Sequence, residues 1–503
     1  MILACDLGTG GVKASLYRED GVSMASCFQG YTTAYRPGGL HEQRPADWWQ
    51  GVCAAARELL NGKRAAEVRA VALSGFSMTA VPLDRAGKPL CEWVPIWSDA
   101  RAGSEAKQFF QTVDREAWYR LTGSGDPPEL YPAMKLMWLR EHAPELWQST
   151  ARVLGTKDYI NYRLTGEMAT DYSYASGSGV FDLMNLRYDG ALLEAARLPS
   201  GLMPEPVEAH ERIGRVTAAA ACETGICEGT PVVCGGVDNT MMALGTTGAR
   251  LNAPYTSLGS SAWIAVTSET PVLDPVARPF VFAFAQKGLY TSGTSIFAAG
   301  SALRWAAELL CPEVKDRELL ALVNRLAEAV PPGANGVWFN PTLAGASPQE
   351  PAGLMGAFGG LSMEINRGDM LRAVMEGVAL SLEGCCLGAL RRSLALGDTM
   401  LLTGGGGKSR LWTQILADVY GMRILRSEAG QEAASRGAAM AALRGLGDAQ
   451  DYQDFDGWLD AGEYTLPDGA YREIYERKRR GFARWIGRGA APGQNSVEEA
   501  FER

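Results

Sequence analysis

Asp6-Leu7-Gly8-Thr9-Gly10 separates two apolar segments at the start of the chain, Ile2 to Cys5 and Val12 to Tyr17. Two such segments joined by a short glycine turn predict a β-hairpin. The backbone N–H groups of the turn could hold phosphate oxygens, and an aspartate at a strand end could anchor a hydrated magnesium ion. An ordinary hairpin with an acidic residue at its end has the same pattern, so the turn by itself leaves both interpretations open.

A second copy of this pattern begins near residue 255. Tyr255 to Leu258 is followed by Gly259-Ser260-Ser261 and then by Ala262 to Val266, in the same order of strand, small-residue turn and strand. Ser257 stands where the first copy has Asp6. Two such hairpins in two repeated halves would close on one polyphosphate from both sides.

The length of the chain agrees with two repeated halves. Its 503 residues exceed the roughly 250–300 residues at which one hydrophobic core stops growing. Strands alternate with helical segments throughout, which predicts an α/β fold. We place the boundary near residue 247, which gives an N-terminal domain over 1–247, a C-terminal domain over 248–487 and a polar tail over 488–503.

Charge and composition exclude several classes of partner. The net charge of −9 argues against nucleic acid or an anionic membrane surface as partner. No stretch approaches the roughly 18 consecutive apolar residues of a spanning helix, and the N-terminus lacks the pattern of a signal peptide, so we expect a cytoplasmic protein. The ten cysteines are scattered and only three histidines exist, so we expect reduced, mostly buried thiols.

A second aspartate lies just past a buried strand. Pro231 to Cys234 leads into Gly235-Gly236-Val237-Asp238-Asn239, where a helix is expected to start. A carboxylate at Asp238 could take the proton of a hydroxyl as its oxygen attacks phosphorus. The glycine pair favours close approach of a ligand because side chains are missing there. An aspartate near a helix N-terminus is also a common cap, so a structural role stays open.

A glycine-rich loop follows a late strand, in Leu401-Leu402-Thr403-Gly404-Gly405-Gly406-Gly407-Lys408-Ser409. It lacks the spacing of a Walker A loop, which needs glycine where Leu402 stands, and it lacks the final glycine of the dinucleotide fingerprint. The remaining functional interpretation is a flat glycine wall against which a nucleotide base or ribose packs. The alternative is a plain turn.

Trp97-Ser98-Asp99-Ala100-Arg101 combines an indole with a carboxylate and a guanidinium. Such a set can stack on the C–H face of a sugar and bond its hydroxyls. An interior tryptophan beside an ion pair would have the same sequence. For Arg101 we favour the structural ion pair over contact with an acidic substrate.

Five stretches, taken together, resemble the FGGY family of carbohydrate kinases, and the resemblance covers nearly the whole chain. They include the first hairpin, the segment of the second aspartate and the glycine-rich loop, together with two stretches that resemble sequence signatures of the family. In chain order they are Asp6 to Lys13, Pro132 to Leu139, Gly235 to Asn239, Gly356 to Leu361 and Gly404 to Ser409.

The resemblance implies two actin-like, ribonuclease H-like α/β domains, with ATP and a sugar meeting in the cleft between them. It implies that Asp238 is the general base and that Asp6 positions a hydrated Mg²⁺ ion. The other residues that it assigns to ATP hold the phosphates or line the adenosine site. They are Gly8, Thr9, Gly10, Lys13, Gly259, Ser260 and Ser261 on the phosphates, and Gly404, Gly405, Gly406 and Ser409 near adenosine.

Within the family the chain most resembles the xylulose kinases, through His41 to Gln43 with Trp48-Trp49, the Trp97 to Arg101 segment, and Lys157 to Gly166, and it departs from them at two places, of which the first matters for the substrate and the second is Gly345 to Pro348. Those kinases usually have Gln-Met-His as sugar ligands after the strand that ends in Ser-Gly, whereas this chain has Phe76-Ser77-Met78-Thr79. Loss of the histidine changes the hydrogen bonds offered to the substrate. The residues expected to face the sugar are Ser77, Met78, Trp97, Asp99, Asp238 and Asn239.

We therefore expect an ATP-dependent kinase for a ketopentose such as xylulose. Another ketose, polyol or aldonic acid is the alternative, with L-xylulose, ribulose, erythritol and gluconate as examples. A non-catalytic, nucleotide-dependent sugar sensor on the same fold is the second alternative, which the presence of both Asp6 and Asp238 disfavours. The one protein partner that we consider is a second copy of the chain, in a homodimer.

Overall fold

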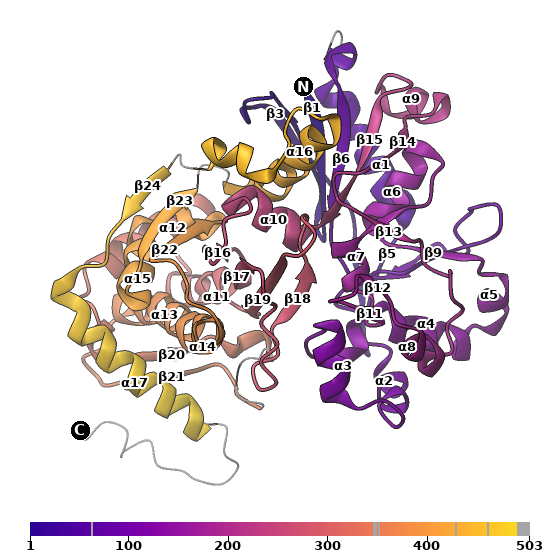
Figure 1. The fold of residues 1–503 in the computed structure, drawn as a ribbon. Helices are drawn as coiled ribbons and strands as arrows, with labels where there is room; N and C mark the ends of the chain where they lie inside the picture. The colour runs from indigo at the N-terminus through magenta and orange to yellow at the C-terminus, as the bar shows by residue number, and fades with distance from the viewer. Residues whose placement is uncertain (62–63, 346–349, 351–352, 428–429, 460–461, 490–503) are drawn as a thin grey trace.

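The structure is a computed structural model that describes residues 1–61, 64–345, 350, 353–427, 430–459 and 462–489. It has two lobes, each built on one mixed β-sheet with helices around it (Figure 1). The N-terminal domain runs from β1 to α10, and the C-terminal domain runs from β16 to α17.

The sheet of the N-terminal domain has six strands. β1, β6 and β15 are parallel neighbours, while β2 and β3 continue the sheet antiparallel on one side and β14 on the other. In spatial order the strands are β14 (Arg212–Arg215), β15 (Pro231–Val237), β6 (Ala70–Gly75), β1 (Ile2–Gly8), β2 (Gly11–Tyr17) and β3 (Ser23–Gly30).

The sheet of the C-terminal domain repeats this arrangement. β16, β22 and β23 are its parallel neighbours, β17 and β19 correspond to β2 and β3, and β24 to β14. In spatial order the strands are β18 (Phe280–Ala283), β19 (Tyr290–Ile296), β17 (Ala262–Ser268), β16 (Pro254–Leu258), β22 (Thr399–Thr403), β23 (Arg423–Ser427) and β24 (Gly462–Thr465). The repeat predicted from the two hairpins is confirmed.

Helices cover these sheets, and short strand pairs extend the domains. The N-terminal helices are α1 (Pro45–Leu59), α2 (Gly103–Phe109), α3 (Arg115–Thr122), α4 (Pro132–His142), α5 (Pro144–Ser149), α6 (Thr156–Thr165), α7 (Tyr172–Ser176), α8 (Gly190–Ala196), α9 (Ala218–Thr224) and α10 (Asp238–Thr247). The C-terminal helices are α11 (Gly300–Leu310), α12 (Asp316–Glu328), α13 (Arg367–Ser381), α14 (Gly388–Ser393), α15 (Arg410–Tyr420), α16 (Ala433–Leu446) and α17 (Arg472–Gly489). The short strands are β4 (Ala34–Arg36), β5 (Leu40–Gln43), β7 (Val81–Leu83), β8 (Val94–Pro95), β9 (Arg152–Leu154), β10 (Thr170–Asp171), β11 (Phe181–Asp182), β12 (Arg187–Tyr188), β13 (Pro206–Val207), β20 (Trp338–Asn340) and β21 (Ala357–Gly359).

Two helices cross from one domain to the other. α10 follows the N-terminal sheet but also contacts β16, β17, β19 and β22, whereas α16 follows β23 and packs on β1, β6 and β15 (Figure 1). The two helices touch through backbone: a Cβ on Gly437 would lie 2.0 Å from the Met241 carbonyl oxygen, and one on Gly245 would lie 1.8 Å from that of Ala433. Only glycine fits at such a crossing.

The long apolar segment Arg367–Ser393 contains α13, a π-helical turn at Leu382–Leu387 and α14. In the part of the chain that the structure describes, it is the one helix long and apolar enough to cross a membrane, but 78% of its most apolar window is buried inside the protein. Met375 and Val378 belong to the core of the C-terminal domain. This segment is therefore a core helix.

Several sequence expectations need correction. Cys222 and Cys227 are exposed, although all ten cysteines are free thiols. α17 extends to Gly489, beyond the expected start of the tail at residue 488, and residues 490–503 lie outside the described part of the chain. The boundary near residue 247 stays a prediction; α10 ends there, at Thr247.

Candidate active site

Three parallel strands of the N-terminal sheet end side by side. Gly75 pairs with Leu7 of β1 on one side and with Val237 of β15 on the other. The first hairpin turn, the segment Phe76–Thr79 and Asp238 therefore leave the same edge of the sheet. In open α/β sheets, ligands bind at the carboxyl ends of the strands.

Asp6 is half-buried near the end of β1. Its Oδ1 accepts a hydrogen bond of 2.7 Å from the hydroxyl of Ser74, on the neighbouring strand β6. Lys13 lies directly opposite on β2. Burial raises the pKa of the Asp6 carboxyl, and the Ser74 hydrogen bond and the charge of Lys13 only partly oppose this effect.

Asp238 is the first residue of α10 and is also half-buried. Its Oδ1 accepts a hydrogen bond of 2.8 Å from the backbone N–H of Asn239. Burial, and then the nearby negative charge of Asp6, raise the pKa of Asp238 to about 7. Two carboxylates that repel each other at one edge of a sheet form a site suited to a cation or a proton.

The first hairpin turn is held from three directions. Gln43 Nε2 donates to the Thr9 carbonyl oxygen at 2.7 Å, and the hydroxyl of Thr33 donates to the same oxygen at 3.3 Å. Trp97 Nε1 donates to Thr9 Oγ1 at 2.8 Å. Gly10 is exposed, with open space where a Cβ would lie. Gln43, the last residue of β5, therefore supports this turn.

The Trp97–Arg101 segment divides into an open part and a buried part. Trp97 is 38% exposed, whereas Asp99 is fully buried. Asp99 accepts hydrogen bonds from the backbone N–H of His41 and from the Arg101 guanidinium, which also pairs with Glu42 at 2.7 Å. The structural ion pair of Arg101 is confirmed. The role of Asp99 as a sugar ligand stays a prediction, and its present partners are all protein groups.

The segment after β6 has an uncommon backbone. Met78 has a φ of +59°, in the left-handed region that a non-glycine residue rarely adopts. Ser77 and Met78 are both buried. The hydroxyl of Tyr174 donates to the Phe76 carbonyl oxygen at 3.0 Å, and Lys135 donates to that of Met78 at 2.8 Å. This segment is therefore fixed by side chains from α4 and α7.

In the C-terminal domain, the second hairpin lies beside the glycine-rich loop. β16 and β22 are paired up to Ser257 and Thr403. A Cβ on Gly404, whose φ is +91°, would lie 2.6 Å from the Leu258 carbonyl oxygen, and a Cβ on Gly406 would lie 2.4 Å from the Leu258 side chain. The two predicted nucleotide-binding loops therefore form one surface whose contacts require glycine.

The second hairpin also packs on the start of α11. The backbone N–H of Gly300 donates to the Gly259 carbonyl oxygen at 2.9 Å, and that of Ser301 donates to the carbonyl oxygen of Ser260 at 3.0 Å. Ser409 is the N-cap of α15: its hydroxyl accepts from the Trp412 N–H at 3.1 Å and contacts Asn324. Its predicted contact with adenosine is untested.

A buried charge network supports the backbone before Asp238. Lys157 is fully buried and pairs with Asp158 at 2.6 Å and with Asp171 at 3.0 Å. Asp171 accepts a hydrogen bond from the Ser173 hydroxyl, whose oxygen in turn accepts the N–H of Val237 at 3.0 Å. The network therefore ends on the residue that precedes the predicted base.

Sequence reasoning missed Ser74, Lys135, Ser173 and Gly300. Lys135 belongs to the stretch Pro132 to Leu139 that resembles a family signature. A lysine among the apolar residues at the start of α4 was the one sign in the sequence that it has a buried role. Ser74 and Ser173 are small polar residues that sequence alone does not distinguish from surface ones.

The residues present fit a nucleotide with its metal ion. Within the described ranges, no group of three or more His, Cys, Asp or Glu side chains could hold a metal. Mg²⁺ commonly binds through one or two carboxylates, completed by phosphates and water. Asp6 and Asp238 offer the carboxylates, so Mg²⁺ would have to be bound together with the phosphates of its nucleotide.

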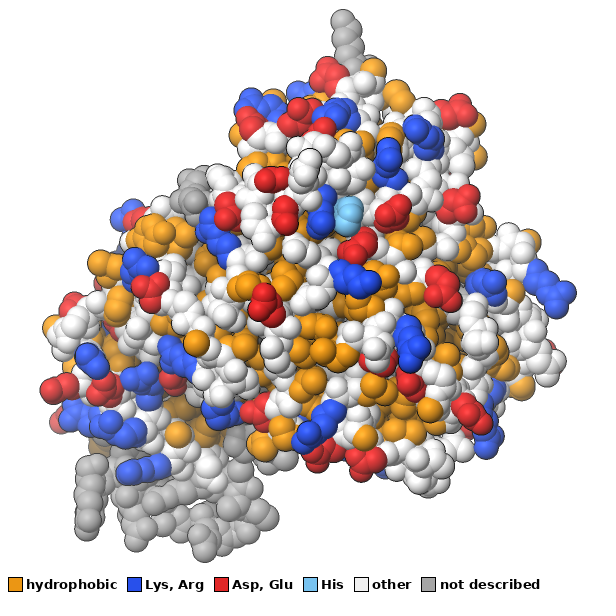
Figure 2. Space-filling view, in the orientation of Figure 1, with side chains coloured by type: hydrophobic (Ala, Val, Ile, Leu, Met, Phe, Trp, Pro, Cys, Tyr) orange, Lys and Arg blue, Asp and Glu red, His pale blue; other side chains and the backbone are white. Residues whose placement is uncertain are grey.

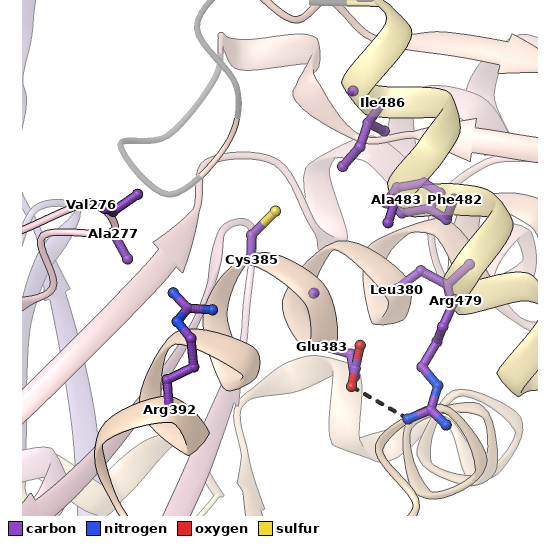
Figure 3. A pocket seen from close by; sticks show the side chains of 12 residues that line it. Val276, Ala277, Leu380, Glu383, Cys385, Arg392, Arg479, Phe482, Ala483 and Ile486 are labelled. Atoms are coloured by element: carbon purple, nitrogen blue, oxygen red, sulfur yellow. Dashed lines mark hydrogen bonds and ion pairs between the residues drawn. The ribbon is translucent and has the colours of Figure 1, made fainter. Parts of the chain in front are cut away.

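Two surface features lie apart from these residues. On the face shown in Figure 2, basic and acidic side chains are interspersed. A cavity of about 330 Å³ opens on the C-terminal domain beside α17 and the π-helical turn, with Cys385, Phe482 and Arg479 among its lining residues (Figure 3). It contains none of the predicted site residues.

Two repeated α/β domains, with two carboxylates at the strand ends of one and glycine loops at the strand ends of the other, define an actin-like sugar phosphotransferase. Models of the FGGY family of carbohydrate kinases match the chain, the N-terminal domain over residues 1–245 and the C-terminal domain over residues 255–446. The chain belongs to the FGGY family of carbohydrate kinases.

Individual relatives agree with this assignment. The chain is 30% identical to the xylulose kinase of Bacillus subtilis (strain 168), over 89% of this chain and 88% of that protein. The crystal structure of xylulose kinase from Rhodospirillum rubrum matches with a TM-score of 0.88 and 31% identity, over 97% of this chain and 98% of that chain. Gluconate kinase from Lactobacillus acidophilus matches with a TM-score of 0.90 and 25% identity, over 98% of each chain.

Proposed function

We propose that this carbohydrate kinase transfers the γ-phosphate of ATP to a hydroxyl of a ketopentose, with Asp238 as general base. The observation that carries this proposal is the placement of Asp6 near the end of β1 and of Asp238 directly after β15, the two parallel strands on either side of β6, where burial and the charge of Asp6 raise the pKa of Asp238 to about 7. A base with a pKa near the working pH accepts protons effectively.

In the proposed reaction, Asp238 accepts the proton of the sugar hydroxyl while its oxygen forms a bond to the γ-phosphorus. The bond from that phosphorus to the bridging oxygen breaks, and ADP leaves. Thr9, Gly10, Gly259 and Ser260 hold the phosphates, and Gly404 lines the adenosine side. Mg²⁺, held through Asp6, would neutralise the charge of the phosphates.

The ketopentose assignment has support from two sides. Two of the relatives described above are named xylulose kinases. Trp97 is exposed beside Thr9, so its indole can stack on a sugar close to the phosphate hairpin. Ser77 and Met78 stand where xylulose kinases usually have a methionine and a histidine, which disfavours D-xylulose itself. Because one structural relative is named a gluconate kinase, an aldonic acid remains the second candidate.

An ADP-release screen over ketoses, polyols and aldonic acids, with mass and NMR analysis of the product, tests this proposal. We expect Mg²⁺-dependent ADP release with one ketopentose, and a phosphorylated sugar as product. A phosphorylated polyol or aldonic acid would overturn the ketopentose assignment. ADP release without phosphorylated product across the whole panel would instead favour the sugar sensor.

Three further proposals accompany this function. A cytoplasmic location would supply both ATP and the sugar, and the ten free thiols agree with a reducing compartment. A homodimer is testable by sedimentation. We expect no binding to nucleic acid or membranes, since the net charge is −9.

A further inference from the structure

Lys135 lies in the first half of α4 and is almost completely buried, with 2% of its surface exposed. Its ammonium group donates a hydrogen bond of 2.8 Å to the Met78 carbonyl oxygen and one of 2.6 Å to that of Ile96. Both acceptors are backbone groups, one in the loop after β6 and the other in the loop after β8. One lysine therefore ties these loops together.

Each of the two loops carries residues predicted to face the sugar. Ser77 and Met78 belong to the first, in which Met78 has the strained φ of +59°. Such a conformation persists only where the surroundings enforce it. A charge-assisted hydrogen bond to the Met78 carbonyl oxygen fixes the orientation of that peptide, and so contributes to this enforcement.

The second loop connects the same lysine to the phosphate hairpin. The Ile96 carbonyl oxygen also accepts the backbone N–H of Asp99, at 3.0 Å, which closes the turn that presents Trp97. Trp97 in turn donates to Thr9 Oγ1. A continuous path of contacts thus runs from the Met78 loop through Lys135 to the hairpin expected to hold phosphate.

Holding an ammonium group in this place is unfavourable for stability. Burial lowers the pKa of Lys135 to about 7; the charge of Asp99 opposes this shift and that of Arg101 adds to it. Asp99 is already bonded to Arg101 and to the His41 backbone, so it is not free to pair with the lysine. A well-packed apolar side chain would avoid this cost.

We propose that Lys135 is a positioning residue that sets sugar specificity by locking the Met78 loop and the Trp97 loop into one rigid wall. This inference rests on the proposed function, because it requires these loops to contact the sugar. It assigns a role to the family signature Pro132 to Leu139, for which the sequence offered none.

The test is Lys135→Met, which keeps the length of the side chain but removes its donors, measured by steady-state kinetics with the best sugar and the next best sugar of the panel. We expect the KM for the sugar to rise at least tenfold and the ratio of kcat/KM between the two sugars to fall at least tenfold. The KM for ATP should stay within twofold. Lys107→Met, at an exposed position of α2 in the same domain, is the matched control and should leave all three values unchanged.

A folded Lys135→Met protein with unchanged sugar KM and unchanged sugar discrimination would overturn the inference. So would a parallel loss of sugar and ATP binding, since that marks a merely structural lysine. If Lys135→Met does not fold, Lys135→Leu, which also lacks a donor, takes its place with the same criteria. If the wild-type protein phosphorylates no member of the panel, the proposed function itself fails, which is a distinct outcome.

Discussion

At the scale of single residues, the site depends on two carboxylates whose charges disfavour each other. Asp238 has a pKa of about 7 because it is buried and because Asp6 is close. A carboxyl group in this position can change its protonation state near neutral pH, whereas an exposed aspartate is ionised throughout that range. Two measurements follow from this one property.

The first is the pH dependence of activity. The base must be unprotonated to accept the hydroxyl proton, so kcat/KM for the sugar should fall as the pH drops below about 7, approaching a tenfold loss per pH unit. Profiles measured with the panel's best sugar between pH 5.5 and 8.5 give the apparent pKa. A flat profile down to pH 5.5 would contradict the raised pKa of Asp238.

The second is the pH dependence of stability in Asp238→Asn. Because the pKa is raised in the folded protein, folding is favoured by the protonated form, and the free energy of unfolding decreases as the pH rises from about 4 to 7. Removing the charge should therefore raise Tm at pH 8, by about 2–4 °C for each kcal/mol by which the free energy of unfolding increases. At about pH 4, near the usual pKa of an aspartate, the difference in Tm should nearly vanish, and a lower Tm of the variant at pH 8 would show that the carboxylate stabilises the fold.

At the scale of elements, the contact between α10 and α16 joins the two domains. The Gly437→Ala substitution would place a Cβ 2.0 Å from the Met241 carbonyl oxygen, so the helices would have to separate. We expect the free energy of unfolding to fall by about 1–3 kcal/mol, the usual range for overpacking.

Denaturant unfolding measures this loss. Gly190→Ala is the matched control, because Gly190 begins the exposed end of α8 and a Cβ there would meet nothing within 4 Å. Equal stability of the two variants would mean that the helix crossing tolerates the extra methyl group.

The elements that could be predicted from sequence were those with a local signal. Pro45 marks the start of α1, and the glycine turns mark both hairpins. β3 and β24 consist of exposed and half-buried residues and were missed, because edge strands carry no continuous apolar run. The packing of α10 against the C-terminal sheet and of α16 against the N-terminal sheet was also missed, because no local pattern shows on which sheet a helix packs.

Residues of the candidate site could likewise be predicted only where the local sequence carries a signal. The positions of Asp6, Asp238 and Gly404 could be predicted because these residues lie at or just after the end of an apolar strand, beside glycines, whereas their roles stay predictions. The partners that hold the site, such as Gln43 on the Thr9 carbonyl oxygen, come from distant parts of the chain and follow only from the tertiary structure. The bonds of Asp99 to the His41 backbone and to Arg101 also follow only from the tertiary structure, and its role as a sugar ligand stays a prediction.

At the scale of the whole molecule, the proposed function divides the two substrates between the two domains. The predicted sugar ligands lie in the N-terminal domain, and the glycine wall for adenosine lies in the C-terminal domain. Substitutions on the two sides should therefore separate the two KM values.

In Gly404→Ala, a Cβ would clash with the Leu258 carbonyl oxygen at a φ of +91°, so the KM for ATP should rise at least tenfold while the sugar KM changes less than threefold.

In Ser77→Ala, the loss of one hydroxyl should raise the sugar KM about fivefold, which corresponds to a loss of about 1 kcal/mol of binding free energy, and the KM for ATP should stay unchanged. Steady-state kinetics with each substrate varied in turn checks both variants. The reverse pattern in either variant would contradict this division.

The most direct test of the whole account is the turnover of Asp238→Asn with the best sugar of the panel, measured together with ATP binding by calorimetry. Loss of a general base predicts a decrease in kcat of about 10²–10⁴-fold, with the affinity for ATP nearly intact. A variant that still turns over within tenfold of the wild type would contradict the assignment of Asp238 as the base.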